Sequence, residues 1–521
     1  MQKSKVLRMG GRNARKAKRA ADLPENMKPV KPGHKGGNFR PLKEDDLPKI
    51  HESVLQVLED IGMEQAIPSC IEACTSIGCK LSADGRLLFP RAVIKETIDK
   101  AARNITLYGQ SPENDILLSN KNVYFGTAGA AVHMLDPISR KFRESTSADL
   151  FDIARICDKL DNIHFFQRSI VLRDLEDVRE MDFNTCYASI AGTKKHVGTS
   201  FSFPENVEEA LKMLHIISGS EKKWRERPFV SMSCCFVVPP MKFAEDASAC
   251  LESGVKGGIP VLLLSAGQAG ATSPASLARC VVQSVAEVLA GLVYVNAIQE
   301  GAPAIFGTWP FVSDLRTGAM SGGSGEQAIL MAACGQMAQY YNLPSGIAAG
   351  MTDSKIPDAQ SGYEKGYTVS LAGHSGANLI YESAGMHASL LGCCLESYVI
   401  DNDMLGAINR TVRGIEVNKE TLSIEPISEV CLKGPGHYLG HPQTLNRMQT
   451  DYLYPNVGDR ENINNWIDQG STDIIQRAHL QVNEILKTHF PKNWDDKTDN
   501  IIRDSFPVRI PKNRMQSKVL K

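Results

Sequence analysis

The stretch that decides the fold is IPVLLLS (259–265), followed by a helical stretch at 273–299 and then by APAIFGTW (302–309). Both outer runs are almost continuously apolar, which is typical of strands that are covered on both faces of a parallel sheet. The segment between them is long enough to form a helix that returns the chain to the start of the next strand. This strand–helix–strand unit predicts an α/β fold with a parallel sheet.

The same alternation continues in both directions from this unit. Strand-like apolar runs lie at 123–127, 163–172, 196–203, 229–238, 259–265, 302–309, 345–351 and 378–382. Helical stretches follow them at 148–160, 177–190, 205–218, 243–256, 273–299, 323–341, 359–374 and 387–397. Eight such pairs favour closure into a (β/α)8 TIM barrel over an open sheet. We therefore predict a barrel that spans residues 123–398.

Two further regions flank the predicted barrel. Residues 44–122 contain an amphipathic helix at 44–62 and short strand-like runs, which indicates a small α+β region. Residues 399–505 carry a helical stretch at 472–489, and we expect this C-terminal extension to pack on the barrel. The basic and polar residues 506–521 are expected to form a frayed tail.

Charge is distributed unevenly along the chain. The first 43 residues hold thirteen Lys and Arg against two acidic residues, whereas the remaining residues have a net charge of −12. A basic leader of this kind either binds an acidic partner or nucleic acid, or is a solvated and disordered tail, which we expect here. The acidic body argues against nucleic acid as the main substrate.

Composition restricts the class of protein. A hydrophobic content of 42% and a charged content of 22% are those of an ordinary globular chain and exclude a disordered or collagen-like one. The longest apolar stretch, 280–298, is interrupted by polar residues, so we expect no membrane span. The chain has thirteen cysteines but no Cys-x-x-Cys pair and no export signal, which predicts reduced thiols and a cytoplasmic location.

Several common motifs are missing from the sequence. No phosphate-binding Gly-x-x-x-x-Gly-Lys loop, no dinucleotide-binding Gly-x-Gly-x-x-Gly after a strand and no His-Glu-x-x-His is present. Cys431, His437 and His441 are the nearest approach to a zinc site, but glycines and a proline place them on a loop without regular spacing. We therefore expect no metal centre.

The active site of a TIM barrel lies at the carboxyl ends of its strands. In this sequence aromatic residues gather at those positions together with two acidic residues, Asp353 and Glu382. The aromatic residues are Tyr124, Phe125, Trp309, Phe311, Tyr363 and Tyr381. Aromatic faces beside an acid are how proteins hold quaternary ammonium groups, through cation–π attraction. The alternative is that these aromatic side chains belong to the core or the rim of the barrel.

Several motifs are similar to those of a known family. The segments TDSK (352–355), DAQSGYEK (358–365) and SDLRTGA (313–319) resemble the trimethylamine methyltransferase family, as do GGNFRPL (36–42) and GHPQTL (440–445). The resemblance covers roughly residues 36–490 and implies a TIM barrel. It also implies methyl transfer from a methylated amine to the cobalt of a separate corrinoid protein, so that this chain itself holds no tightly bound cofactor.

One departure from the family pattern separates its subgroups. The archaeal trimethylamine enzymes contain pyrrolysine, whereas this chain has only the twenty standard residues, and Lys355 is one candidate for the equivalent position. Without pyrrolysine the chain resembles the bacterial branch that includes glycine betaine methyltransferase. A quaternary ammonium substrate fits this departure, because its demethylation expels a neutral amine and needs no acid.

The resemblance implies roles for the residues at the barrel mouth. Trp309, Phe311, Tyr363 and Tyr381, with Tyr124, would form an aromatic cage, and either Glu382 or Asp353 would balance the cation. Arg316, His374 or His387 would hold the carboxylate of a betaine. The chemistry is mainly orientation of the methyl donor for in-line displacement by Co(I). We also expect a homo-oligomer. The alternatives are a trimethylamine enzyme, a zinc-dependent methanol or thiol methyltransferase, and a non-catalytic barrel that binds methylated amines.

Overall fold

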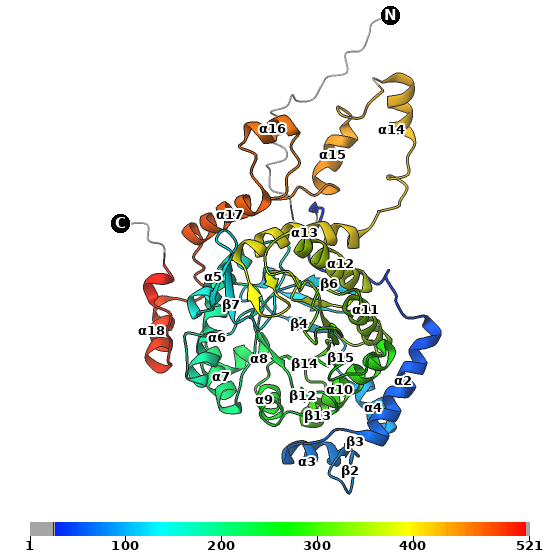
Figure 1. The fold of residues 1–521 in the computed structure, drawn as a ribbon, viewed down its shortest axis with the longest axis vertical. Coiled ribbons are helices and arrows are strands. Elements are labelled where there is room, and N and C mark those ends of the chain that lie inside the picture. The colour runs from blue at the N-terminus through cyan, green and yellow to red at the C-terminus, as the bar shows by residue number, and fades with distance from the viewer. Residues whose placement is uncertain (1–23, 25–26, 435, 517–521) are drawn as a thin grey trace, which may run out of the picture.

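A closed barrel of eight parallel strands forms the body of the molecule (Figure 1), and the predicted fold class is confirmed. The computed structural model describes residue 24, residues 27–434 and residues 436–516. The barrel strands are β6 (Asn122–Phe125), β9 (Phe166–Gln167), β10 (Val197–Thr199), β11 (Val230–Cys234), β14 (Val261–Ser265), β16 (Ala304–Thr308), β18 (Gly346–Ala348) and β19 (Leu379–Tyr381). Each lies within a run that the sequence predicts, except that β6 begins one residue earlier, at Asn122.

The barrel closes through two narrow seams. One panel of five strands has the order β16-β14-β11-β10-β9, and β18, β19 and β6 form a second panel. A single parallel bridge between Gly126 and Phe165 joins β6 to β9, and another between Phe306 and Ser345 joins β16 to β18. All pairings between neighbouring barrel strands are parallel, so the carboxyl ends of all eight strands open at one end, the mouth.

Helices surround the barrel on the outside, as Figure 1 shows. They are α5 (Ser147–Asp158), α6 (Val178–Gly192), α7 (Pro204–Ser218), the short α8 (Glu221–Glu226), α9 (Glu245–Lys256), α10 (Leu277–Ile298), α11 (Gly325–Tyr340), α12 (Ala359–Ser375) and α13 (Leu395–Arg413). Helix α10 is long and apolar enough to cross a membrane by composition, but 72% of its apolar window is buried inside the molecule, as in a core helix.

The eighth helix departs from its prediction. Residues 387–397 were expected to be helical, but β20 (Met386–His387) and β21 (Gly392–Cys393) form an antiparallel hairpin there, and α13 starts at Leu395. Gly385 begins this segment with φ +87°, a conformation that favours glycine over any other residue. The barrel unit therefore ends at Arg413 and not at residue 398.

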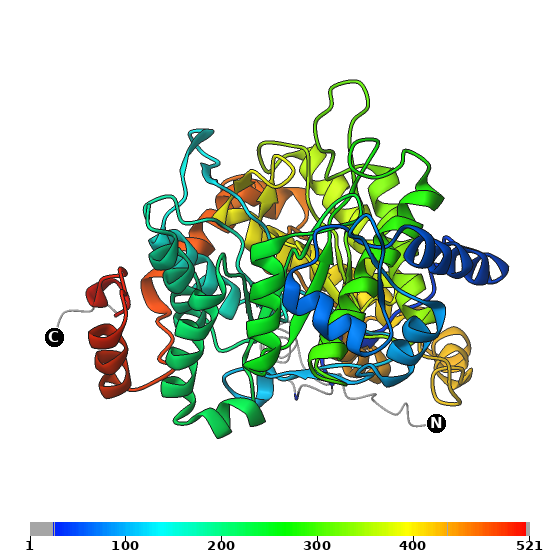
Figure 2. The same ribbon diagram turned by 90° about the horizontal axis from the view of Figure 1, so that it is seen from below.

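A small sheet and several loops rise above the mouth. The hairpin β7 (His133–Asp136) and β8 (Lys141–Glu144) follows β6, and its first strand pairs with β21. Figure 2 shows this hairpin in cyan at the top of the molecule. Shorter pairs, β12 (Val237–Val238) with β13 (Lys242–Phe243) and β15 (Gln268–Ala269) with β17 (Phe311–Val312), follow other barrel strands.

The N-terminal region packs against the outside and the amino end of the barrel. It consists of α2 (Leu47–Gln56) with a π-helical turn to residue 61, α3 (Pro68–Ser76), α4 (Arg91–Lys100) and the short hairpins β2 (Lys80–Leu81)–β3 (Leu87–Leu88) and β4 (Ile105–Leu107)–β5 (Ile116–Leu118). Asp115, in the β4–β5 hairpin, forms an ion pair with Arg227, just before β11 begins. The hairpin therefore lies at the end opposite the mouth.

The predicted disordered leader, 1–43, is ordered over its second part. Residues His34–Lys35 form β1, which pairs antiparallel with β6. The carbonyl oxygens of Pro29 and Lys31 accept hydrogen bonds from Arg413 and Asn409 of α13. Backbone pairing and helix contacts thus anchor this part, while residues 1–23 lie outside the described residues.

The C-terminal region divides into two parts. Helices α17 (Ile474–Thr488) and α18 (Asp496–Ser505) pack on the barrel, and the expected frayed tail is ordered to residue 516: Phe506 stacks on Phe183 and Arg514 pairs with Asp152. Helices α14 (Glu425–Ser428), α15 (Pro442–Thr450) and α16 (Ile463–Asp468), in contrast, project away from the barrel (Figure 1). The extension as a whole was expected to pack on the barrel.

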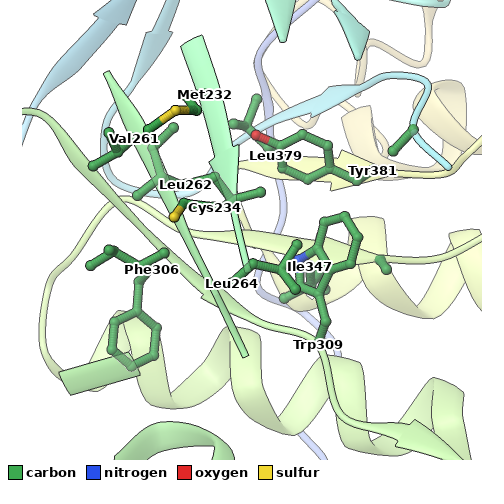
Figure 3. Close-up of a cluster of buried hydrophobic side chains, with 14 of the residues drawn as sticks. Met232, Cys234, Val261, Leu262, Leu264, Phe306, Trp309, Ile347, Leu379 and Tyr381 are labelled. Carbon is green, nitrogen blue, oxygen red and sulfur yellow. The ribbon is translucent and has the colours of Figure 1, made fainter. Parts of the chain in front are cut away.

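The barrel core is filled by side chains from its strands and from the segments that follow them. Figure 3 shows the indole of Trp309 pointing toward Ile347 and Tyr381, with Leu262 and Leu264 alongside. These five side chains are at most 5% exposed. They close the inside of the barrel below the mouth, so a ligand can enter only from above them.

Candidate functional site

Glu382 is a buried carboxyl group that lacks a partner at the mouth of the barrel. It follows β19 directly and is 2% exposed, and its Oε2 atom is buried without a hydrogen-bond partner. Among the residues that the structure describes, none forms an ion pair with it. Burial raises the pKa of Glu382 to about 8, because desolvation disfavours the charged form. A cation placed beside it would offset that cost.

The backbone around Glu382 is held in an uncommon conformation. Its φ is +60°, which is costly for a residue with a side chain and is kept only where the surroundings enforce it. The N–H of Ser383 donates to Gly126 O (3.0 Å), and the N–H of Gly385 donates to Asp401 Oδ2 (2.8 Å). A Cβ atom on Gly350 would lie 2.7 Å from Glu382 O, so this neighbouring position requires glycine.

Asp401 is itself part of a buried ion pair behind the mouth. Lys365 of α12 donates through Nζ to Asp401 Oδ2 at 2.7 Å, and the two side chains are 2% and 6% exposed. Helix α12 begins at Ala359 because Asp358 accepts the N–H of Ser361, a capping box. The cap fixes the start of the helix and thereby the height at which Lys365 meets Asp401.

Arg168 is a second charged residue near the mouth. It follows β9, donates through Nε to Ser200 Oγ (3.0 Å) and through Nη1 to Gly129 O (3.2 Å), and forms no ion pair within the described part of the chain. Burial lowers the pKa of its guanidinium, although Arg remains charged at any physiological pH. The nearby carboxyl group of Asp182 is occupied by Ser202 and Asn206.

A hollow lies at the ends of β9, β10 and β11, beside Arg168. The pocket has a volume of about 260 Å³ and is lined by Arg168, Ser200 and Cys235, among others. The side chain of Cys235 is exposed to this hollow, yet burial raises the pKa of its thiol. Glu382 raises the same pKa further and Arg168 lowers it. Glu382 does not line the hollow itself, but its carboxyl group and the guanidinium of Arg168 both lie close enough to Cys235 to shift the pKa of that thiol.

Aromatic side chains fill the inside of the barrel near the ends of β16 and β19. The rings of Trp309 and Tyr381 lie 5.2 Å apart, Phe311 lies 6.4 Å from Trp309, and Phe165 lies edge-on to Tyr381 at 4.9 Å. Trp309 Nε1 donates to Gly346 O at 3.0 Å, which fixes the indole. Three of the predicted cage residues, Trp309, Phe311 and Tyr381, are thus brought together.

Other predicted cage and carboxylate-binding residues lie elsewhere. The hydroxyl of Tyr124 donates to Leu117 O of the β4–β5 hairpin, at the amino end of the barrel. His374 is in the last turn of α12, also at the amino end, where its Nε2 meets Thr411 Oγ1. Tyr363 is 61% exposed on the outer surface. Sequence position places these residues near strands, but the direction of each side chain decides which end it reaches.

The remaining predicted residues lie at the mouth but have other partners. Asp353 accepts hydrogen bonds from Ser321, Gly322 and Ser389, which tie two loops together and already compensate much of its charge. Arg316 is exposed on its loop, where it pairs with Asp314. His387 is fully buried behind the mouth, and burial holds its pKa well below the usual range. Of the two predicted counter-ions, the geometry favours Glu382.

No group of three or more His, Cys, Asp or Glu side chains that could hold a metal ion occurs in the described residues. At the loop that carried the zinc alternative, His441 contacts Glu429 and caps α15.

Arg168 and Cys235 were missed by the sequence reasoning. A lone arginine within the apolar run 163–172 is a signal that was available, because a charge in a buried strand is rare unless it is paired or used.

The fold defines the class of protein, a TIM barrel, and the candidate site lies at the carboxyl ends of the strands, where barrel enzymes perform their chemistry. Within that class, a model of the trimethylamine methyltransferase family matches residues 8–510. The chain belongs to the trimethylamine methyltransferase family, and the resemblance seen in the sequence is confirmed.

Relatives in two subgroups are similar along nearly their whole length. A trimethylamine methyltransferase from Desulfitobacterium hafniense is 32% identical over 89% of this chain and 92% of its own. A glycine betaine methyltransferase from the same species is 29% identical over 88% and 94%. The crystal structure of the monomethylamine methyltransferase of Methanosarcina barkeri overlays 91% of this chain and 92% of its own, with 12% identity and a TM-score of 0.48.

Proposed function

We propose that this protein transfers a methyl group from a quaternary amine that also bears a carboxylate, as glycine betaine does, to the Co(I) of a corrinoid carried by a separate protein. The observation that carries this proposal is the buried carboxyl group of Glu382, which has no partner among the described residues. A charge of this kind costs stability, and a protein keeps it where a ligand compensates for it.

A quaternary ammonium group suits the surroundings of Glu382. The cation would pair with the ionised carboxylate and rest on the faces of Trp309 and Tyr381. Its positive charge already activates the carbon–nitrogen bond, and the departing amine is neutral. No acid is therefore needed to protonate the leaving group, and the proton of Glu382 leaves when the cation binds.

Arg168 supports a substrate with an anionic end. Its guanidinium lines the hollow beside Cys235, a thiol whose pKa Glu382 also affects, and it has no ion-pair partner in the described residues, so it is available to a carboxylate. Trimethylamine offers no anion to Arg168. A betaine offers both charges, and the two ends would fix its orientation.

Orientation is then the main contribution of the chain. The low-valent cobalt of the corrinoid supplies the nucleophile. Glu382 and Arg168 would hold the donor at its two ends so that an N-methyl carbon points out of the mouth, toward the side from which a partner protein approaches. The packed aromatic core below the hollow excludes water from the rear of the substrate.

A donor panel tests the proposal. The purified chain is mixed with free cob(I)alamin and with glycine betaine, trimethylamine or no donor, and the loss of the cob(I)alamin absorbance is followed. We expect methyl transfer with glycine betaine and little with trimethylamine. Faster transfer from trimethylamine would contradict the role of Arg168. Tight binding of betaine without transfer, also in the presence of a corrinoid protein, would mean a non-catalytic barrel.

A further inference from the structure

The arm, defined as residues 415–470, exposes an unusual number of large apolar side chains. Thirteen such side chains are between 37% and 90% exposed. They are Ile415, Val417, Leu422, Ile424, Ile427, Leu432, Tyr438, Leu439, Tyr452, Tyr454, Ile463, Trp466 and Ile467. Single exposed apolar residues are ordinary, but a concentration of them in one segment marks a contact surface.

The helices of the arm lack the packing that stabilises helices. Helices α14, α15 and α16 have four, nine and six residues, and none of them has a buried residue. Isolated helices shorter than about 12–15 residues are marginal in water, since helices in proteins depend on tertiary contacts. Polar contacts hold the arm in its interior, where Arg413 donates to Thr450 O and Asp403 accepts backbone N–H groups of 456–458. Another surface must therefore cover the segments on either side of these contacts.

We infer that the arm is the contact surface for a second copy of this chain. The surface that covers the helices of the arm must be present whenever the chain is folded. A second copy of the chain meets this condition, because it is produced together with the first and at the same concentration. The exposed fractions of the thirteen side chains correspond to roughly 1,500 Å² per chain, against about 800 Å² per partner in a standard interface. Obligate homodimer interfaces are larger and more apolar than this standard.

The position of the arm separates this contact from the reaction. The arm starts after Arg413, where α13 ends at the amino end of the barrel. Figure 2 shows its gold part below the barrel, on the side away from the cyan hairpin at the mouth. A protein that approaches the mouth would lie at the other end and leave the arm uncovered.

The N-terminal segment of the same chain is a poor occupant. Residues 1–26 contain eight Lys and Arg but only five side chains of Met, Val or Leu, too few to cover the arm. In a symmetric dimer the arm of each copy covers the arm of the other, because the same patch forms both sides of the interface and no other component is needed.

The test compares two matched double variants of the full chain by sedimentation velocity. Ile424→Glu/Ile463→Glu places charges on the arm, at side chains that are 76% exposed. Ile138→Glu/Leu391→Glu places them on hairpin turns at the mouth, at side chains that are 61% and 60% exposed. We expect the wild type and the mouth variant to be dimers or larger at about 10 µM, and the arm variant to associate at least about 100-fold more weakly.

If the arm variant does not fold, hydrogen exchange of the wild type tests whether the arm is the contact surface. The amides of α15 and α16 should be protected at about 10 µM and lose protection on dilution to the monomer. A wild-type chain that is monomeric at about 10 µM would overturn the inference. So would equal dissociation of both variants, or arm protection that does not change between dimer and monomer.

Discussion

Two buried carboxyl groups near the mouth differ in whether they have a partner. Asp401 lies behind the mouth and is paired with Lys365 at 2.7 Å, with a further hydrogen bond from the N–H of Gly385. Glu382 lies at the floor of the mouth and has no partner in the described residues. Burial raises the pKa of both groups, but Lys365 opposes the rise only for Asp401.

A buried carboxyl group with an ion-pair partner serves the architecture, whereas one without a partner is available for binding. The pair Lys365–Asp401 is complete, and through Gly385 it fixes the turn that carries Glu382. Glu382 is incomplete until something positive arrives. Removing one member of the complete pair should therefore damage the fold, whereas neutralising Glu382 should damage binding and improve the fold. Replacements at Lys365 test the complete pair, and replacements at Glu382 and its surroundings test the incomplete site.

The largest expected effect follows the replacement Lys365→Met. It leaves Asp401 buried without a partner, which costs about 3–5 kcal/mol of unfolding free energy. The measurement is a urea titration at pH 7. The matched double variant Lys365→Met/Asp401→Asn removes the stranded charge and should recover most of the loss. Equal losses in the single and double variants would mean that Lys365 acts through packing alone.

Glu382→Gln should change binding and stability in opposite directions. We expect affinity for glycine betaine to fall about 100-fold, the loss of a charge-assisted contact worth about 1.5–3 kcal/mol. The unfolded carboxyl group ionises near its ordinary pKa of 4.5 and the folded one near 8, so wild-type stability falls as the pH rises through this interval. The variant should lack this fall and unfold at a higher temperature at pH 8.

Calorimetric titration across pH gives the second readout of Glu382. Binding of a permanent cation requires the ionised carboxylate, so wild-type affinity should rise about tenfold per pH unit below the pKa of about 8 and level off above it. The Glu382→Gln variant should show a flat profile. A wild-type profile without any slope between pH 6 and 8 would contradict the pairing of Glu382 with the cation.

Arg168→Gln tests the positive charge near the mouth, as Glu382→Gln tests the negative one. Affinity for glycine betaine should fall by about 10- to 100-fold, because a charge-assisted bond to a carboxylate is worth about 1.5–3 kcal/mol. Affinity for tetramethylammonium, which has no carboxylate, should change less than about twofold. Arg168→Lys keeps the charge but not the planar fork, and we expect it to retain part of the difference. Parallel losses for both ligands would place Arg168 in a structural role.

The smallest expected effect concerns the aromatic floor. Trp309→Leu keeps apolar volume but removes the ring, worth roughly 1–2 kcal/mol toward a desolvated cation, or about a five- to thirty-fold loss of affinity for a betaine. The carbon isostere 3,3-dimethylbutanoate, in which a neutral tert-butyl group replaces the trimethylammonium group, should bind both forms about equally. If the affinity for both ligands falls equally, Trp309 contributes packing alone. Its hydrogen bond to Gly346 O and its low exposure are consistent with such a role.

Much of the fold is encoded in local pattern. Runs such as 259–265 are apolar throughout because both faces of the strand are covered, and this property marks a parallel barrel without reference to contacts. The eighth helix was misplaced because 385–394 has an apolar content that suits either a helix or a hairpin. Only the positive φ of Gly385 and the pairing of β20 with β21 separate these two outcomes.

The site was less accessible to sequence reasoning. Glu382, Trp309 and Tyr381 were found because barrel geometry singles out the ends of strands. Tyr124 was assigned to the mouth although its side chain reaches the opposite end, since one residue near the end of a strand can point along either direction. Arg168 was not predicted. What makes it a candidate is that it has no ion-pair partner in the described residues, and this property depends on its three-dimensional surroundings and not on composition.

The two seams of the barrel have a mechanical consequence. Each panel is held by ladders of backbone pairs, whereas the β16–β18 seam has one bridge, at Phe306–Ser345. The β6–β9 seam also has one bridge, at Gly126–Phe165, but Thr127 and Gln167 exchange hydrogen bonds across it. Thermal breathing of the wall should therefore concentrate at the β16–β18 seam, where the least bonding resists separation. The indole of Trp309 joins the two sides of this seam through its hydrogen bond to Gly346 O. The barrel is stiff within its panels and more elastic along this seam.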